Sequence, residues 1–190
     1  MNTVLKKSRA VWMFLAVATA FFFSAAPVEA RGVKVNVTDD PSSHYFRAAG
    51  ADFTGYDVAV IDIEEVKTNN DKGVDEVKSA AYQSLETWLR QSGMFKEVKD
   101  KTEKYTGKAL IIKAKVSVNW GSRAARAFGS FGAGSARINI IYNVYAKGSD
   151  KLLAKMDADD ATSQNVDARV MVSRAAEKWN KVFIDKILYK

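Results

Sequence analysis

Two segments of regular alternation constrain the fold more than any other feature of this sequence. Ala109 to Trp120 and Ala136 to Lys147 each alternate apolar with mostly polar residues over twelve positions. Successive side chains of a β-strand point to opposite faces of the sheet. Each segment is therefore predicted to be a strand with one apolar and one mostly polar face, and the apolar face needs a cover.

Further strands are predicted around this pair. A turn at Gly148-Ser149-Asp150 is followed by a third strand from Leu152 to Asp159, which completes an antiparallel meander. Asp57 to Ile63 is apolar and rich in β-branched residues, as is typical of a buried strand. Met94 to Asp100 is predicted to be a short strand, and Lys67 to Gly73 a polar loop.

Two segments have the period of an amphipathic helix instead. The first begins at Val74 and ends before Gly93, and the second runs from Val166 to Tyr189. The apolar stripes are Val77, Ala81, Leu85, Trp88 and Leu89 in the first, and Val170, Met171, Ala175, Trp179, Val182, Phe183 and Ile187 in the second. The fold class is therefore α+β: a two-layer sandwich with a mixed sheet, an antiparallel three-strand meander and both helices on one face.

A membrane-spanning β-hairpin is the alternative for the alternating pair, because such strands need about nine to eleven residues. The helices already supply a cover for the apolar face, and lysines on the other face suit water. The domain organisation is predicted as a leader at 1–30, an irregular arm at 31–56 with a short strand near Gly32 to Val37, and a single domain at 57–190.

The leader has the composition of a secretory signal peptide. Three basic residues precede an uncharged apolar run from Ala10 to Ala26, and small residues then stand before a cleavage site between Ala30 and Arg31. The run is shorter than the ~20 residues that span a bilayer comfortably, so an uncleaved anchor is the weaker interpretation. Sec export of the soluble chain to the periplasm is expected.

Charge and cysteine content exclude several classes of function. The leader carries three basic residues and one acidic residue, so its removal lowers the net charge from +7 to +5. The balance is mildly basic and spread along the chain, which does not indicate nucleic-acid binding. The sequence has no cysteine, which excludes disulfides, a thiolate nucleophile and a lipoprotein acylation site.

Between the alternating strands lies a segment rich in glycine and arginine, from Trp120 to Ala136. Its glycines permit positive φ, and its arginines offer planar donors for carboxylates or phosphates. Two interpretations remain open for this segment. In one it is an irregular crossover whose arginines pair with acidic residues of the same domain and whose phenylalanines close the end of the core. In the other it is a recognition loop for an anionic envelope component or a protein partner. The candidate partner- or anion-binding residues are Trp120, Arg123, Arg126, Phe128, Gly129, Phe131, Gly132, Gly134 and Arg137.

This segment carries a resemblance to a known family. The motif G-S-R-A-A-R at 121–126, the G-S-F-G-A-G at 129–134 and the G-M-F at 93–95 resemble a bacterial envelope family known as domain of unknown function 4410. The order of elements is more distantly similar to the N-terminal domain of TolB and to the periplasmic domain of the curli secretion lipoprotein. The chain departs from the family pattern at 147–151, where a T-G-K turn is usual, and at 159–163, where glycines often precede the last helix. The resemblance implies an envelope location and no known activity.

Other polar residues suggest no catalytic site. His44 is the sole histidine and has no serine or cysteine motif near it. The carboxylates Asp57, Asp62, Glu64 and Glu65 fit a solvated strand end better than an acid/base pair. Asp157, Asp159 and Asp160 lack the glycine and distal glutamate of a calcium loop. No cofactor and no metal site are expected.

The sequence thus favours a non-enzymatic binding or assembly module of the envelope, with the loop at 121–134 as its contact surface. The expected partner is an envelope protein or an anionic envelope component, with peripheral membrane contact and oligomerisation left open. The alternatives are an enzyme acting on envelope material and a structural component that self-associates through strand edges.

Overall fold

The computed structural model describes residues 33–69, 73–121, 135–162 and 168–189. The chain divides into two units, Met1–Arg31 and Gly32–Lys190, and all described residues belong to the second. The predicted leader and its cleavage site at Ala30 and Arg31 lie outside the described residues. The elements are β1 (Tyr45–Arg47), β2 (Val58–Thr68), α1 (Val74–Ser92), β3 (Glu97–Asp100), β4 (Ala109–Asn119), β5 (Ala136–Ala146), β6 (Leu152–Thr162), α3 (Ala168–Val182) and the π-helix η1 (Phe183–Leu188).

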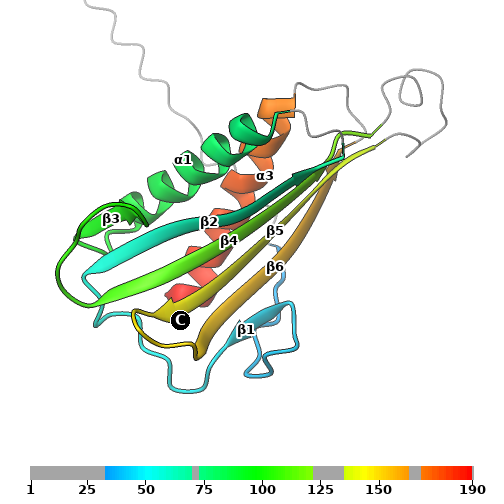
Figure 1. The fold of residues 1–190 in the computed structure, drawn as a ribbon. Coiled ribbons are helices and arrows are strands. Elements are labelled where there is room, and N and C mark those ends of the chain that lie inside the picture. Colours follow the sequence, from blue (N-terminus) through cyan, green and yellow to red (C-terminus); the bar gives the residue numbers. More distant parts are fainter. Residues whose placement is uncertain (1–32, 70–72, 122–134, 163–167, 190) are drawn as a thin grey trace, which may run out of the picture. The chain divides into compact units, whose positions relative to one another are not determined.

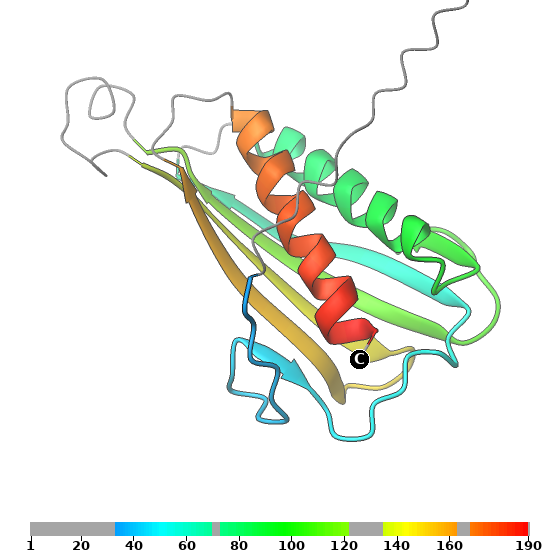
Figure 2. The same cartoon turned by 180° about the vertical axis from the view of Figure 1, so that it is seen from behind.

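The strands form one six-stranded sheet in the order β1-β6-β5-β4-β2-β3. β2 pairs in parallel with both β3 and β4, whereas β4, β5 and β6 pair antiparallel in chain order and β1 pairs antiparallel with β6. Both helices cross the same face of this sheet (Figures 1 and 2). The predicted α+β class with a mixed sheet and two helices is confirmed.

The alternation of β4 and β5 decides which side chains meet the helices. In β4 every second residue from Leu110 to Val118 is buried, and in β5 the same holds from Ala136 to Val144. Removing apolar surface from water stabilises this packing by roughly 25 cal/mol per Å². The side chains between them lie on the opposite side of the sheet, called the open face below.

Helix α1 begins and ends as its sequence predicts. Gly93 adopts a left-handed φ of 66°, and its N–H donates to the carbonyl of Arg90, which closes the last turn. Val77, Ala81, Leu85 and Leu89 are buried. Trp88 is half-buried and packs against the core rather than lying fully inside it.

The predicted apolar stripe of the last helix is partly wrong. Val170 is 41% exposed, whereas Val172 and Ala176 are buried. The chain continues as a π-helix from Phe183, where Tyr189 N–H donates to the carbonyl of Ile184 five residues earlier at 2.9 Å. Val170 lies nine residues before Trp179, and at about 100° per residue the two positions fall on opposite sides of α3, so they cannot share one buried stripe. Residues 166 and 167, where the helix was predicted to begin, lie outside the described residues.

The N-terminal arm is more closely bound to the sheet than predicted. Over its described part, 33–37, the short strand expected near Gly32 to Val37 is not formed, and β1 follows it instead. Phe46 of β1 and Phe53 after it are buried in the core. The predicted loop from Lys67 is also wrong at its start, because β2 continues through Thr68.

One polar network lies inside the apolar layer between sheet and helices. The hydroxyl of Tyr142 on β5 donates to Asn180 Oδ1 on α3 at 2.5 Å, and Asn180 Nδ2 donates to Ser84 Oγ on α1 at 2.9 Å. Asn180 is completely buried. Buried amides cost free energy unless they are hydrogen-bonded, so this chain of bonds fixes how the two helices sit against β5.

Among the described helices, none has the length and apolar character needed to cross a bilayer.

Candidate functional site

The middle of the open face carries charged side chains in pairs. Lys113 lies 2.8 Å from Glu64, Lys101 lies 2.7 Å from Asp62, and Lys67 lies 2.7 Å from Glu65. Hydrogen bonds to these carboxylates raise the pKa of Lys101 and Lys113, and the bond from Lys67 lowers the pKa of Glu65. Asp57, beside the first residue of β2, is likewise paired with Lys96 at 2.8 Å. Each of the four carboxylates from which an acid/base pair could have been drawn therefore forms an ion pair with a lysine.

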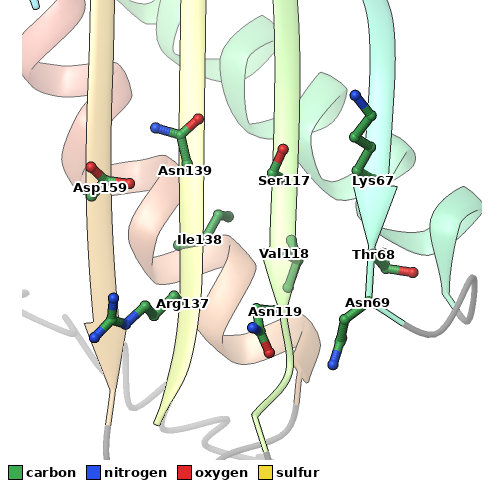
Figure 3. A pocket seen from close by; sticks show the side chains of 10 residues that line it. All are labelled: Lys67, Thr68, Asn69, Ser117, Val118, Asn119, Arg137, Ile138, Asn139 and Asp159. Carbon is green, nitrogen blue, oxygen red and sulfur yellow. The ribbon is translucent and has the colours of Figure 1, made fainter.

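A different arrangement occurs where β4 and β5 approach the glycine- and arginine-rich segment. An open hollow of about 370 Å³ lies at this end of the sheet, called the loop-end hollow below. Figure 3 shows its side chains on neighbouring strands. Its lining residues are Lys67, Thr68, Asn69, Ser117, Val118, Asn119, Arg137, Ile138, Asn139 and Asp159.

Strand register places the polar lining residues in two rows. The inner row is Lys67, Ser117, Asn139 and Asp159, which are direct neighbours across β2, β4, β5 and β6. The outer row, nearer the loop, contains Asn119 opposite Arg137, and Asn69 directly after β2. Residues two apart on a strand share a face, so both rows lie on the open face.

Hydrogen bonds fix the orientation of the asparagine side chains in the hollow. They determine whether the oxygen or the nitrogen of each amide remains available to a ligand. Asn69 Oδ1 accepts from the backbone N–H of Trp120 at 3.1 Å, and Asn119 Oδ1 accepts from that of Gly121 at 2.9 Å. Asn139 Nδ2 donates to the Asp157 carboxylate at 2.8 Å. A backbone N–H can only donate and a carboxylate can only accept, so the orientation of each amide is determined.

Two of the three charged residues that line the hollow, Arg137 and Asp159, have opposite signs and no partner in the described part of the chain. Arg137 and Asp159 are exposed, and neither forms an ion pair or hydrogen bond with any residue in the described part of the chain. Arg137 thus differs from Lys67, Lys101 and Lys113, whose ammonium groups each have a carboxylate. Its guanidinium retains its planar set of N–H donors.

Of the nine predicted binding residues, two lie in the described part of the chain. Arg137 lies in the hollow. Trp120 does not line it; this residue is half-buried, packs against the core, and approaches Gly73. The remaining candidates lie outside the described residues: Arg123, Arg126, Phe128, Gly129, Phe131, Gly132 and Gly134.

Sequence analysis missed the asparagines and Asp159 as members of one site. The alternation does assign Asn119 and Asn139 to the polar face of their strands, which was the available signal. Asp159 could have been found from the predicted meander, because the turn at 148–150 brings it opposite Asn139. Asn69 could not, because β2 and β4 are far apart in the chain and pair only through strand order.

The histidine and the aspartates of β6 do not form a metal site. His44 is 71% exposed, with Nδ1 3.3 Å from Asp157 Oδ2. Asp160 lies on the helix side of the sheet, where its carboxylate is 3.1 Å from Lys178 Nζ, so it cannot converge with Asp157 and Asp159. In the described ranges, no three histidine or carboxylate side chains are placed to hold a metal ion.

Comparison with known proteins identifies the family. Residues 32–164 match the model of the domain of unknown function DUF4410. The chain belongs to this family. Membership confirms the resemblance carried by the motifs around the glycine- and arginine-rich segment. The family description names no activity, and no curated protein matches the sequence significantly.

Several solved structures resemble part of this DUF4410 chain. A PelC dodecamer variant from Paraburkholderia phytofirmans is 13% identical, with 66% of this chain and 83% of that chain covered and a TM-score of 0.45. A homologue of a neuraminyllactose-binding hemagglutinin from Helicobacter pylori is 10% identical, with coverages of 72% and 87% and a TM-score of 0.43. The rare lipoprotein B of Shewanella oneidensis is 9% identical, with coverages of 66% and 90% and a TM-score of 0.28. Nothing about the function of this chain follows from these likenesses.

Proposed function

We propose that this protein is an exported, periplasmic, non-enzymatic binding module that contacts a partner in the bacterial envelope through the loop end of its open face. The contact surface consists of the loop-end hollow and the adjoining segment at 121–134. The observation that carries the proposal is Arg137, an exposed guanidinium without an ion pair among the described residues.

Electrostatics distinguish this end of the open face from the rest. Towards the middle, Lys101 and Lys113 are already neutralised by carboxylates of β2. An incoming anionic group would have to displace those carboxylates, whereas at Arg137 it meets donors that no described residue occupies. Arginine binds carboxylates and phosphates through two parallel hydrogen bonds, which makes it selective as well as attractive.

The sequence adds further support next to Arg137. The segment leading to β5 contains Arg123 and Arg126, and its glycines permit close backbone approach. A contact surface that combines these arginines with Arg137 would suit a protein or polymer with exposed anionic groups. The leader supports the periplasmic location, and the paired state of the strand carboxylates gives no support to an acid/base reaction at β2.

Strand-edge self-association is a second candidate with its own observation. β3 pairs only with Val58–Ile61, so within the described residues the rest of β2 has a strand partner on one side only. However, a bulge between Ile63 and Glu65 and the charges of Glu64 and Lys67 lie on this stretch. Such features usually prevent pairing of strand edges, so the binding module is the better-supported function. Sedimentation of the purified protein separates the two.

The test is site-specific cross-linking in intact cells. A photoreactive residue replaces Asn119 at the hollow, and in a matched variant it replaces Arg174, an exposed residue of α3 on the helix side. The Asn119 variant should give adducts with envelope material, and adding Arg137→Ala should abolish them while the melting temperature changes little. Equal adducts at Arg174, or none at Asn119, would contradict the proposal.

A further inference from the structure

We propose that the loop-end hollow binds an acidic sugar residue of a glycan, with the sugar carboxylate on the outer row and its hydroxyl groups on the inner row. This inference rests on the proposed binding function and names the ligand class for the same surface. It follows from which hydrogen-bonding groups the two rows leave uncommitted.

The outer row presents donors. Because Asn69 Oδ1 and Asn119 Oδ1 are occupied by backbone N–H groups, the Nδ2 amides of both residues remain to donate. Arg137, opposite Asn119 in the register, adds its guanidinium. Asn119 and Arg137 come from neighbouring strands and supply donors for one carboxylate, whereas Asn69, beyond β4, supplies a donor for another oxygen of the ligand (Figure 3).

The inner row presents acceptors at its β5 and β6 end, whereas Lys67 at its β2 end is a donor held by Glu65. Asn139 Nδ2 is committed to Asp157, which leaves Asn139 Oδ1 as an acceptor. Its neighbour Asp159 is a carboxylate without a partner among the described residues, and the hydroxyl of Ser117 can accept or donate. Acceptors of this kind require a ligand that donates, as sugar hydroxyls do, directly beside its anionic group.

An acidic peptide fits this arrangement less well. Its carboxylate could occupy the outer row, but a glutamate side chain has no hydroxyl beside its carboxylate. The acceptors Asn139 Oδ1 and Asp159 would then meet no donor, whereas a sugar acid carries hydroxyls on the same ring as its carboxylate. A neutral sugar also fits less well. Its hydroxyl groups can donate to the inner row, but it has no anionic group for the guanidinium of Arg137.

The hollow has the size for one or two sugar rings. Its volume of about 370 Å³ lies at the small end of ligand sites, which range over about 300–1,000 Å³. It is open along the sheet, so a polymer could continue beyond the bound residue (Figure 3). This shape suits an internal unit of a chain as well as its end.

Calorimetric titration of the full-length purified protein tests the inference with three matched probes. Trigalacturonic acid carries both hydroxyls and carboxylates, maltotriose carries hydroxyls alone, and triglutamate carries carboxylates alone. Trigalacturonic acid should bind at least tenfold more tightly than either of the others. Equal affinity for triglutamate, or no binding of trigalacturonic acid, would overturn the inference.

Two substitutions test which row contacts the sugar carboxylate and which contacts the hydroxyl groups. Arg137→Ala should weaken trigalacturonic acid binding at least tenfold, whereas Arg174→Ala, which removes an arginine from the helix side, should leave it unchanged. Asp159→Ala should weaken trigalacturonic acid binding several-fold and strengthen triglutamate binding, because it removes both an acceptor and a repulsive charge. Weakening of both ligands by Asp159→Ala, or an equal loss in Arg174→Ala, would contradict the assignment.

The outcome is separable from that of the proposed function. If cross-linking at Asn119 captures an envelope protein and trigalacturonic acid does not bind, the binding module stands and only the ligand class is wrong. If neither experiment gives binding at the hollow, both proposals fail.

Discussion

The two faces of the central sheet differ in how their polar side chains are paired. On the helix side, Asn180 is completely buried and satisfied by Tyr142 and Ser84 within the fold. On the open side, the exposed Arg137 and Asp159 have no such partners among the described residues. Asn180 therefore contributes to stability, whereas the loop end of the open face has polar groups available for a ligand.

The difference follows from the free-energy cost of leaving a polar group without a partner, which is high inside the fold and low in contact with water. A buried polar group without a partner costs about 1–3 kcal/mol, which few folds tolerate. An exposed guanidinium is solvated by water and costs the fold little, so it can be kept for binding. Mutations should therefore affect stability on one face and binding on the other.

The largest contrast is expected between two adjacent isoleucines of β5. Ile140 is 1% exposed under the helices, and Ile141 is half-buried on the open face. Ile140→Ala should lower the free energy of unfolding by about 3 kcal/mol, because it removes contacts and leaves a cavity, and Ile141→Ala by about 1 kcal/mol. Urea denaturation measures both; equal losses would mean that the open face is covered in solution.

The next effect concerns the buried network. Asn180→Ala should cost about 2 kcal/mol, since it leaves the Tyr142 hydroxyl buried without an acceptor. Asn143→Ala, on the open side of β5, should cost less than about 0.5 kcal/mol. In a double-mutant cycle, Asn180→Ala combined with Tyr142→Phe should cost less than the two single losses together. Strict additivity would show that the hydrogen bond contributes nothing.

Alkaline pH is expected to lower the stability of the fold by a smaller amount, again through a residue on the helix side of the sheet. Burial raises the pKa of Tyr142 well above its ordinary value of 10.0. Tyrosine is neutral below that value in both states, so its contribution is fully present there and is lost as the pH rises and the unfolded chain ionises. Above pH 10 the wild type should therefore lose stability more steeply than Tyr142→Phe, as followed by urea midpoints. Parallel pH profiles would contradict the buried position of the hydroxyl.

The smallest effects on stability are expected on the open face. Lys113→Ala breaks the ion pair with Glu64, and Arg137→Ala removes a cation that has no ion pair within the described ranges. Exposed ion pairs contribute little, so neither change should move the thermal midpoint appreciably. Only Arg137→Ala should reduce cross-linking at Asn119. A clear loss of stability in Arg137→Ala would instead assign that arginine a structural role.

Much of the architecture could be predicted because local periodicity reports it directly. The alternation of β4 and β5 identified which side chains of Ala109 to Trp120 face the core, and Gly93 marked the end of α1. The last helix was harder. The predicted stripe joined Val170 to Trp179, although nine residues at about 100° each put them on opposite sides of the helix. The buried face contains Val172 and Ala176 instead.

The candidate site could be predicted only in part. Arg137 was identified because it stands next to a segment of unusual composition. Asn69 and Asp159 were not, because nothing in their own neighbourhood distinguishes them from other polar strand residues. They become part of a site only when β2 pairs with β4 and β6 pairs with β5.

By itself, the sequence determined most helices and strands and the apolar side of β4 and β5, because these depend on residues near one another in the chain; the export signal at 1–30 stays a prediction. The turn between β5 and β6 also indicated that Asn139 and Asp159 lie on paired strands. The tertiary structure alone decided that β2 pairs in parallel with β4, which brings Lys67 and Asn69 to Ser117 and Asn119, because the hydrogen bonds between these strands join distant parts of the chain.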